Sequence, residues 1–253
     1  MRNLTVDAVI LKKYPRGEAD VSVVLYAPTL GRVQATAKGA RKINSNFTGH
    51  LDTLNICRLQ LYANGPHFTI TQCQAINTHK NIRDSLERSI MALLLLEILQ
   101  KTTYSTETGA KLFDLIRLTL ENLSSTNKTT LIVESFKIKL MAELGVLPDF
   151  AHCALCHRKW ESGEQISLEE DGQITCFDCS TPQKILSTVP FTIAKLGYHL
   201  HQLPYEAIEK IALSENEEDH LKKLTTFFLQ HFLNRELNTG NLVAKSRSSV
   251  VLQ

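Results

Sequence analysis

The chain has 253 residues, of which 43% are hydrophobic and 21% charged, and its formal net charge is +2. This composition is that of a globular protein with a sizeable core, which excludes a disordered or low-complexity chain. No apolar run approaches the roughly 18 residues that cross a bilayer, and the N-terminal residues lack the apolar centre of a signal peptide. We therefore expect neither a membrane span nor export.

The positive charge is concentrated near the N-terminus. Residues 1–80 contain ten lysines and arginines against four acidic residues, whereas residues 81–253 contain eighteen against twenty-two. A basic first third joined to a mildly acidic remainder favours contact between the first third and a polyanion. A solvated basic surface without a partner explains the charge equally well, so charge alone does not decide between them.

Residues 4–76 have the pattern of β-strands. Five short segments rich in apolar residues are separated by turn residues, and we place the strands at 6–11, 20–26, 32–38, 55–62 and 67–76. The polar, basic stretch 39–53 interrupts the alternation and is predicted to be a loop or a short helix at one end of the sheet. Five strands with one long connection between the third and the fourth predict an OB-type barrel. A small open sandwich is the alternative.

From residue 81 onward the hydrophobic period becomes that of helices. Apolar residues predict helices over 81–99, 107–123, 130–144, 190–201 and 218–237, and residues 127–130 offer caps for the third of them. Residues 246–253 show no clear pattern and are expected to be a frayed tail. The fold class is therefore predicted to be α+β, with a barrel domain over 1–79 and a helical domain over 80–253.

Four of the six cysteines form two CxxC pairs, Cys153 with Cys156 and Cys176 with Cys179, separated by nineteen residues. Two such pairs on tight turns can converge on one ion, and we therefore predict a structural zinc module over 149–180. Four thiolates fill the coordination sphere of zinc, so no water molecule can be activated there. The alternatives are a redox CxxC pair, an iron–sulfur cluster, and ligation by a histidine that flanks the first pair.

A second signal is a basic segment in the strand region. Lys38, Arg41 and Lys42 lie in the sequence Lys-Gly-Ala-Arg-Lys, and Arg16 and Arg32 are further cations of the same region. If this segment leaves the end of a barrel strand, its cations project beside the groove where OB-type barrels bind single strands. The aromatic residues available for stacking on bases, each of which also fits a hydrophobic core, are Tyr14, Tyr26, Phe47, Tyr62 and Phe68.

Catalytic signatures are missing from the sequence. It contains no GxxxxGK[ST] phosphate loop, no GxSxG elbow and no HExxH motif. The acidic clusters at 169–171 and 215–219 are typical of solvated faces, turns and helix caps. We therefore expect a protein that is not an enzyme.

Four stretches of the chain form a specific combination. They are YPRGEAD at 14–20, GRVQATAKGARK at 31–42, GHLDTL at 49–54, and ELGVLP at 143–148, which leads into the first CxxC pair. With them, the chain resembles the bacterial RecO family of recombination mediators and strand-annealing proteins over essentially its whole length. The AKGAR segment together with a late four-cysteine module is what makes the resemblance specific.

The resemblance implies an N-terminal OB domain that binds single- and double-stranded DNA, and a helical domain that carries the zinc module. Proteins of this family act in the RecF pathway, where they work with RecR and the single-strand-binding protein SSB to let RecA load. They also anneal complementary strands without nucleotide hydrolysis. The resemblance thus implies a cytoplasmic, nucleoid-associated protein. By position, Lys38, Arg41 and Lys42 match the basic segment of the family, with Arg16 and Arg32 as further candidates for DNA contact.

Two departures from the family limit what the resemblance implies. After Lys42 the chain continues Ile-Asn-Ser-Asn-Phe, where the family often has further bases, so we expect fewer DNA contacts there. Some members lack the cysteines, so zinc is not expected to perform the annealing. The alternative function is an RNA-binding or transcription-related zinc protein, and an enzyme with an unrecognised motif is a third hypothesis.

Overall fold

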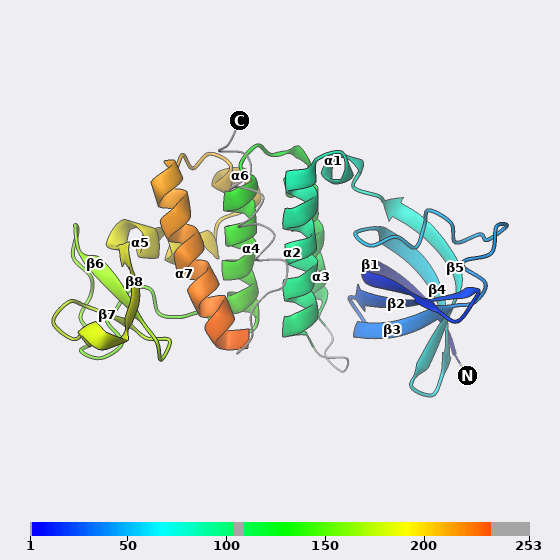
Figure 1. The fold of residues 1–253 in the computed structure, drawn as a ribbon, viewed down its shortest axis with the longest axis horizontal. Helices are drawn as coiled ribbons and strands as arrows, with labels where there is room; N and C mark the ends of the chain where they lie inside the picture. Colours follow the sequence, from blue (N-terminus) through cyan, green and yellow to red (C-terminus); the bar gives the residue numbers. More distant parts are fainter. Residues whose placement is uncertain (1, 104–108, 234–253) are drawn as a thin grey trace. The chain divides into compact units, whose positions relative to one another are not determined.

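A computed structural model describes residues 2–103 and 109–233 and divides them into two compact units. The first unit ends at Ser125 and contains a β-barrel and three helices (Figure 1). The second begins at Thr126 and contains four α-helices and a small sheet. The barrel and the helices that follow it thus share one unit, and the domain boundary after residue 79 stays a prediction.

Five strands close the barrel in the order β1-β2-β3-β5-β4 (Figure 1). The strands are β1 (Arg2–Arg16), β2 (Asp20–Ala27), β3 (Gly31–Ala37), β4 (Ile56–Asn64) and β5 (His67–Asn77). β1 pairs antiparallel with both β2 and β4, and β3 pairs parallel with β5. The OB-type barrel is therefore confirmed, and the open sandwich is wrong because the pairing of β1 with both neighbours closes the sheet.

β1 is much longer than the strand predicted at 6–11. Its first half pairs with β4 and its second half with β2, and a bulge between Ile10 and Lys12 lies where the partner changes. Bulges of this kind bend a strand, which allows one strand to serve both neighbours. The sequence pattern missed the second half because Lys12 and Lys13 are both exposed and interrupt the alternation.

The barrel interior is filled by the alternate residues that each strand turns inward. In β3, Ala35 and Ala37 are buried, whereas Thr36 between them is half-buried and Gln34 before them is exposed. Larger side chains such as Ile10 and Leu25 complete the same core cluster. The outer face of β3 consequently carries polar side chains, Gln34 and Thr36 among them.

The long connection between β3 and β4 is a loop with turns, which decides between the loop and the short helix left open by the sequence. Asn55, which is fully buried, donates from Nδ2 to the carbonyls of Gly49 (3.1 Å) and His50 (2.8 Å). Arg83 donates from Nη2 to Asn55 Oδ1 at 2.8 Å. These bonds fasten the end of the loop to the first helix.

The helices of the first unit are α1 (Lys80–Arg83), α2 (Leu86–Thr102) and α3 (Ala110–Ser125). The continuous helix predicted over 81–99 is divided because Ser85 is extended, with φ −124°, and its side chain accepts a hydrogen bond from Arg88 N at 3.4 Å. A serine in this position caps the following helix. α2 and α3 both contact β1. Residues 107 and 108 of the second predicted helix lie outside the described part of the chain.

In the second unit, α4 (Thr129–Glu143) is buried on nearly all sides and contacts α5 (Phe191–Leu200), α6 (Tyr205–Ile208) and α7 (Glu215–Leu233) (Figure 1). Two charged residues of α4 are buried with it. Lys137 Nζ lies 2.7 Å from Glu134 Oε2, both side chains are 3% exposed, and Thr225 of α7 donates its hydroxyl to the same carboxylate. This buried pair joins α4 to α7.

The helix starts differ from those predicted. α4 begins after Lys128, whose side chain makes no cap, so the cap expected at 127–130 is wrong. α7 begins at Glu215, three residues before the predicted start at 218, because Ser214 and Glu217 form a capping box. In this box, Ser214 N donates to Glu217 Oε2 (2.8 Å) and Glu217 N donates to Ser214 Oγ (3.4 Å). Residues 234–237 of the last predicted helix and the predicted tail at 246–253 lie outside the described residues.

A three-stranded sheet of order β7-β6-β8 completes the second unit. Its strands are β6 (Gln165–Glu169), β7 (Ile174–Thr175) and β8 (Ile185–Pro190), and a short 3-10 helix spans Pro182–Lys184. The sequence pattern predicted no strand at β8 and no helix at α6. Among the described residues, no helix is long and apolar enough to cross a membrane.

Candidate nucleic-acid interface and candidate metal centre

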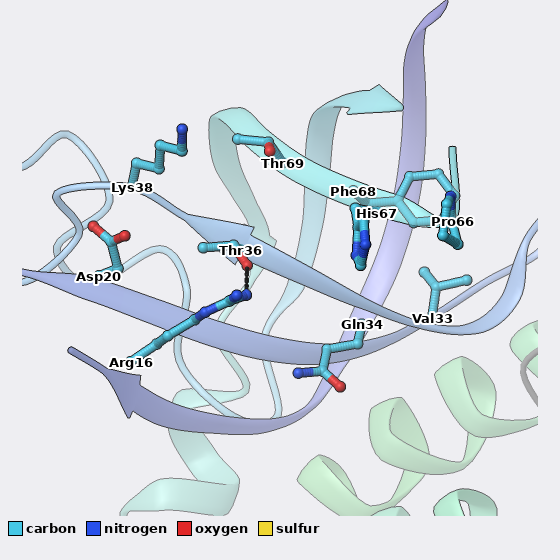
Figure 2. A pocket seen from close by; sticks show the side chains of 10 residues that line it. All are labelled: Arg16, Asp20, Val33, Gln34, Thr36, Lys38, Pro66, His67, Phe68 and Thr69. Carbon is cyan, nitrogen blue, oxygen red and sulfur yellow. Dashed lines mark hydrogen bonds between the residues drawn. The ribbon is translucent and has the colours of Figure 1, made fainter. Parts of the chain in front are cut away.

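A groove of about 840 Å³ lies on the outside of the barrel. It is built by the end of β1 and the start of β2, by β3 and the residue that follows it, and by the turn between β4 and β5 together with the start of β5 (Figure 2). The residues that line it are Arg16, Asp20, Val33, Gln34, Thr36, Lys38, Pro66, His67, Phe68 and Thr69. The faces and loops that border this groove are those with which OB-folds bind oligonucleotides.

The groove has two chemically different ends. Arg16 and Lys38 lie at one end, whereas His67 and Phe68 lie at the other, with Thr36 between them (Figure 2). Cations suit the phosphates of a nucleic-acid strand, and rings offer flat faces on which bases stack. The arrangement therefore places the two kinds of group that a single strand requires along one path.

Two turns at the cationic end are joined by three hydrogen bonds. Gly39 N donates to Asp20 Oδ1 (2.8 Å), Arg41 N donates to Ala19 O (2.9 Å), and Arg41 Nη1 donates to Gly17 O (3.0 Å). Gly17 and Gly39 have φ of 60° and 67°, a region that glycine adopts without steric cost. Residues 17–20 and 38–42, which are separate motifs in the sequence, thus form one structural element.

The structure brings together most of the basic residues singled out from the sequence. Arg16 and Lys38 line the groove, and Arg41 and Lys42 are exposed on the turn beside it. Arg16 is oriented by a hydrogen bond from Nη1 to Thr36 Oγ1 at 2.7 Å. Arg32 is not part of this group: it lies six residues before Lys38 on β3, which corresponds to about 20 Å along a strand.

The cations of the barrel differ in whether their charge is balanced locally. Lys13 forms an ion pair with Asp52 at 2.7 Å, and Arg58 forms one with Asp7 at 2.8 Å. Within the described residues, no ion pair joins any of the five candidate DNA-contact cations to an acidic side chain. Their positive charge is therefore available to an external anion.

The aromatic candidates separate into core and groove residues. Tyr26 is fully buried and donates its hydroxyl to Gly109 O at 3.4 Å, so it cannot stack on a base. Phe47 is half-buried and packs against the barrel core, whereas Phe68 packs there and also lines the groove. His67 lines the groove and is exposed, but sequence reasoning missed it. Its only sequence signal is its place directly after the Asn-Gly-Pro turn.

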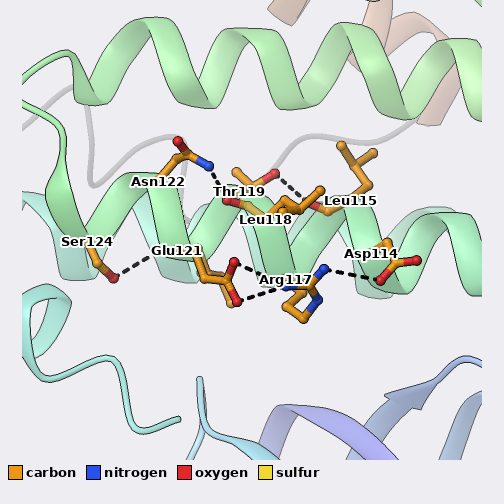
Figure 3. A network of polar contacts seen from close by, with 9 residues as sticks. Asp114, Leu115, Arg117, Leu118, Thr119, Glu121, Asn122 and Ser124 are labelled. Atoms are coloured by element: carbon orange, nitrogen blue, oxygen red, sulfur yellow. Dashed lines mark hydrogen bonds and ion pairs between the residues drawn. The ribbon is translucent and has the colours of Figure 1, made fainter. Parts of the chain in front are cut away.

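Another polar network of the first unit lies on α3 (Figure 3). Arg117 is held between Asp114 (3.4 Å) and Glu121 (2.9 Å), which are three and four residues away on the same helix. Such pairs stabilise a helix by at most about 0.5 kcal/mol each. We assign this network to the stability of α3 rather than to binding.

The four cysteines of the two CxxC pairs come together in the second unit. Their Sγ atoms all lie within 4.8 Å of one another, and they form the one group of possible metal ligands among the described residues. Cys156 Sγ and Cys176 Sγ are 3.9 Å apart. Two thiolates on a tetrahedral zinc, each at about 2.3 Å from the ion, would be about 3.8 Å apart. The site could therefore hold a metal ion.

Backbone hydrogen bonds shape both cysteine turns. His157 N donates to Cys153 O (3.0 Å) and Cys179 N to Cys176 O (3.1 Å), so each pair is folded as a tight turn. Ala154 N donates to the carbonyl of Ile174 at 2.9 Å and thereby holds the first turn beside β7. The two turns face each other because β6 and β7 return the chain between them.

The chemistry of the cluster favours a thiolate at Cys153. Burial alone would raise the pKa of this thiol, but hydrogen bonds from the N–H groups of Cys156, Cys176 and Leu155 lower its pKa to about 6. The thiolate is the form that ligates a metal. The neighbouring His152 is engaged elsewhere, with Nδ1 2.8 Å from Asp149 Oδ2.

Comparison with known protein families agrees with these features. The model of the family described as recombination protein O, N terminal, matches residues 1–79, and the model described as recombination protein O, C terminal, matches residues 83–240. The chain belongs to the RecO family. The resemblance predicted from the sequence is thus confirmed. In RecO terms, the groove lies within the N-terminal region and the four cysteines lie within the C-terminal region.

Individual relatives carry the same name. A DNA repair protein RecO from Dehalococcoides mccartyi is 33% identical over 191 residues, which are 76% of each chain. Another, from Caldanaerobacter subterraneus subsp. tengcongensis, is 24% identical over 246 residues, which are 97% of this chain and 99% of that protein. The similarity to RecO proteins therefore extends over both regions.

Proposed function

We propose that this RecO-family chain is a DNA repair and recombination mediator. It binds single- and double-stranded DNA at the barrel groove, anneals complementary strands without nucleotide hydrolysis, and helps to load RecA on SSB-coated single strands. In this proposal it works with RecR and SSB in the RecF pathway, in the bacterial cytoplasm at the nucleoid. The observation that carries the proposal is the groove with the cations Arg16 and Lys38 at one end and the rings of His67 and Phe68 at the other.

The groove suggests how DNA is held. Lys38 and Arg16 contact phosphates within the groove, and Arg41 and Lys42 do so from the adjacent turn. Arg32, at the far end of β3, contacts a strand that continues along the outer face of the sheet. Phe68 and His67 provide the stacking surface. Binding through these groups is independent of base sequence, as an annealing protein requires.

Annealing requires no covalent step. Two complementary strands repel one another through their phosphates, and cations that neutralise part of this charge lower the repulsion. Base pairing is then favourable by itself. We therefore assign no catalytic residue, and the protein acts as a binding protein rather than as an enzyme.

We propose that the four cysteines hold a structural Zn²⁺, since four thiolates in tetrahedral arrangement are typical of such sites and an iron–sulfur cluster is the alternative. The ion ties together the module over 149–180, which belongs to the proposed helical domain over 80–253. Within the module, Trp160 Nε1 donates to Phe150 O at 3.0 Å. An apolar contact attaches the module to α7, where the Phe150 ring meets Phe228 edge-on with centroids 5.4 Å apart.

The proposal is tested with a charge-reversal variant in which Lys38, Arg41 and Lys42 are replaced by Glu. We expect DNA binding and annealing of SSB-coated complementary strands, measured without ATP, to be lost while the circular dichroism spectrum is unchanged. A matched control reverses three exposed lysines of the second unit and should bind DNA normally; these are Lys159, Lys195 and Lys210. Unchanged DNA binding by the charge-reversal variant would contradict the assignment of Lys38, Arg41 and Lys42 to DNA contact.

A competition experiment separates DNA from RNA. Single-stranded DNA and RNA of one sequence compete for the protein, and we expect DNA to compete at least as well as RNA. Clear preference for RNA would replace the proposal with an RNA-binding function, because readers of the 2′-hydroxyl prefer RNA.

A further inference from the structure

The cationic end of the groove contains an acidic residue. Asp20 lines the groove together with Arg16 and Lys38 and is half-buried. A carboxylate at this place repels phosphate, so on charge alone it would oppose the binding of a nucleic acid. Within the described residues no ion pair joins Asp20 to Lys38, so its role is not to neutralise that lysine.

What Asp20 does is hold the basic turn. Its Oδ1 accepts the hydrogen bond from Gly39 N at 2.8 Å, directly after Lys38. Gly39 O in turn accepts a hydrogen bond from Lys42 N at 3.1 Å, which closes the turn. Lys38 and Lys42 are thus presented from the two ends of a segment whose centre is fixed by the carboxylate.

The carboxylate acts together with the turn over 17–19. Arg41 donates from its backbone N to Ala19 O and from Nη1 to Gly17 O. One of the five guanidinium N–H donors is used in this way, which leaves the others for a phosphate. Three bonds therefore hold residues 38–42 against residues 17–20. One joins two backbone groups, one uses the cationic side chain of Arg41, and one uses the side chain of Asp20. A substitution of Asp20 therefore removes one of these bonds without removing a positive charge.

We propose that Asp20 is a positioning residue for nucleic-acid binding. It fixes the basic turn so that the cations of Lys38 and Lys42 are already arranged for phosphate, and this arrangement outweighs the repulsion from its own charge. A loose turn would have to be ordered when the nucleic acid binds, which lowers affinity. The inference rests on the proposed function, since it assumes that the groove binds DNA.

Two substitutions separate position from charge. Asp20→Asn keeps the oxygen that accepts the Gly39 N–H and removes the negative charge, whereas Asp20→Ala removes both. If only charge matters, both variants bind DNA more tightly than the wild type. If positioning matters, the Asn variant binds more tightly and the Ala variant binds more weakly, by about three- to ten-fold for one lost hydrogen bond.

The experiment measures the anisotropy of a labelled single-stranded oligonucleotide titrated with the full-length wild type and with each variant. Hydrogen exchange of the Gly39 amide, measured by NMR without DNA, provides an independent readout. We expect slow exchange in the wild type and in Asp20→Asn, and faster exchange in Asp20→Ala. The expected order of affinity is Asp20→Asn, then wild type, then Asp20→Ala.

Equal or tighter binding by Asp20→Ala relative to Asp20→Asn would overturn the inference, and so would an equal loss in both variants. If the Ala variant does not fold, Asp20→Leu replaces it, because leucine has nearly the shape of asparagine and no acceptor. Failure of both to fold would show that Asp20 holds the barrel rather than the turn, which also contradicts the proposal. A wild type that binds no DNA would defeat the proposed function instead, while the Gly39 exchange still tests the turn.

Discussion

The salt dependence of DNA binding follows from the number of free cations at the groove. Arg16, Lys38, Arg41 and Lys42 lie in or beside it, and none of them is ion-paired within the described residues. Each phosphate neutralised on a single strand contributes about −0.7 to the slope of log affinity against log salt. On an oligonucleotide too short to reach Arg32, four contacts therefore predict a slope of about −2.8, which is an affinity loss of about 50-fold between 50 and 200 mM salt.

Removal of one cation changes this slope by a defined amount. For Lys42→Gln we expect a slope of about −2.1 and a loss of about 18-fold over the same salt range. Lys195→Gln, which removes an exposed lysine of α5, should leave the slope at its wild-type value. Anisotropy titrations with labelled single-stranded DNA at several salt concentrations measure both. A flat slope in the wild type, or equal changes in the two variants, would refute the reasoning.

Four further expectations concern stability, metal and the extent of the interface. Lys137→Met leaves Glu134 buried without its partner, so urea denaturation should show that the free energy of unfolding falls by about 3–5 kcal/mol. The double variant Lys137→Met with Glu134→Leu should recover most of this loss. Fully additive losses from the two substitutions would contradict the pairing. Burial lowers the pKa of His79 from 6.5 to about 4, so the unfolded chain takes up a proton that the folded chain does not, and stability falls as the pH is lowered from 6.5 to 4. After allowance for solvent screening, the free energy of unfolding should fall by about 2 kcal/mol over this pH range. The fall should be smaller in the control His79→Asn. Asparagine suits this control because it tolerates the φ of 49° at this position. Chelation of the ion should lower the melting temperature but not DNA affinity measured well below it, whereas loss of DNA binding at an unchanged melting temperature would contradict a scaffold role. Arg32→Gln should weaken binding less than Lys38→Gln, and an oligonucleotide too short to reach Arg32 should show no difference for Arg32→Gln.

The fold was predictable where a single period dominates the sequence. The five strands alternate well enough to place the barrel, and the CxxC spacing alone located the four cysteines that lie together. β8 was not predicted because Ile185 is half-buried and the adjacent Leu186 is exposed, so two neighbouring apolar residues hide the alternation. The break at Ser85 was hidden in the same way, by apolar residues that continue the helical pattern on both sides of the cap.

The candidate site was only partly predictable for a different reason. Composition identifies Lys38 and Arg16 as available cations, but the bond from Gly39 to Asp20 spans nineteen residues and has no local pattern. The same holds for Glu134 and Lys137, whose sequence spacing fits an exposed surface pair equally well. In the structure both side chains are 3% exposed, and Glu134 accepts a hydrogen bond from Thr225 of α7, 91 residues away. Partners distant in sequence thus decide which charged residues are free and which are structural.

The four cysteines differ in burial, and this difference determines how oxidants and chelators reach the site. Cys153 and Cys176 are closed off from solvent, whereas Cys156 is exposed and Cys179 is half-buried. Oxidants and competing chelators therefore approach an ion held there from one side, and Cys156 is the first sulfur they meet. If the proposed ion is bound there, its release would begin at this one ligand while Cys153 and Cys176 still hold it, and exchange of the ion would not require the surrounding sheet to unfold.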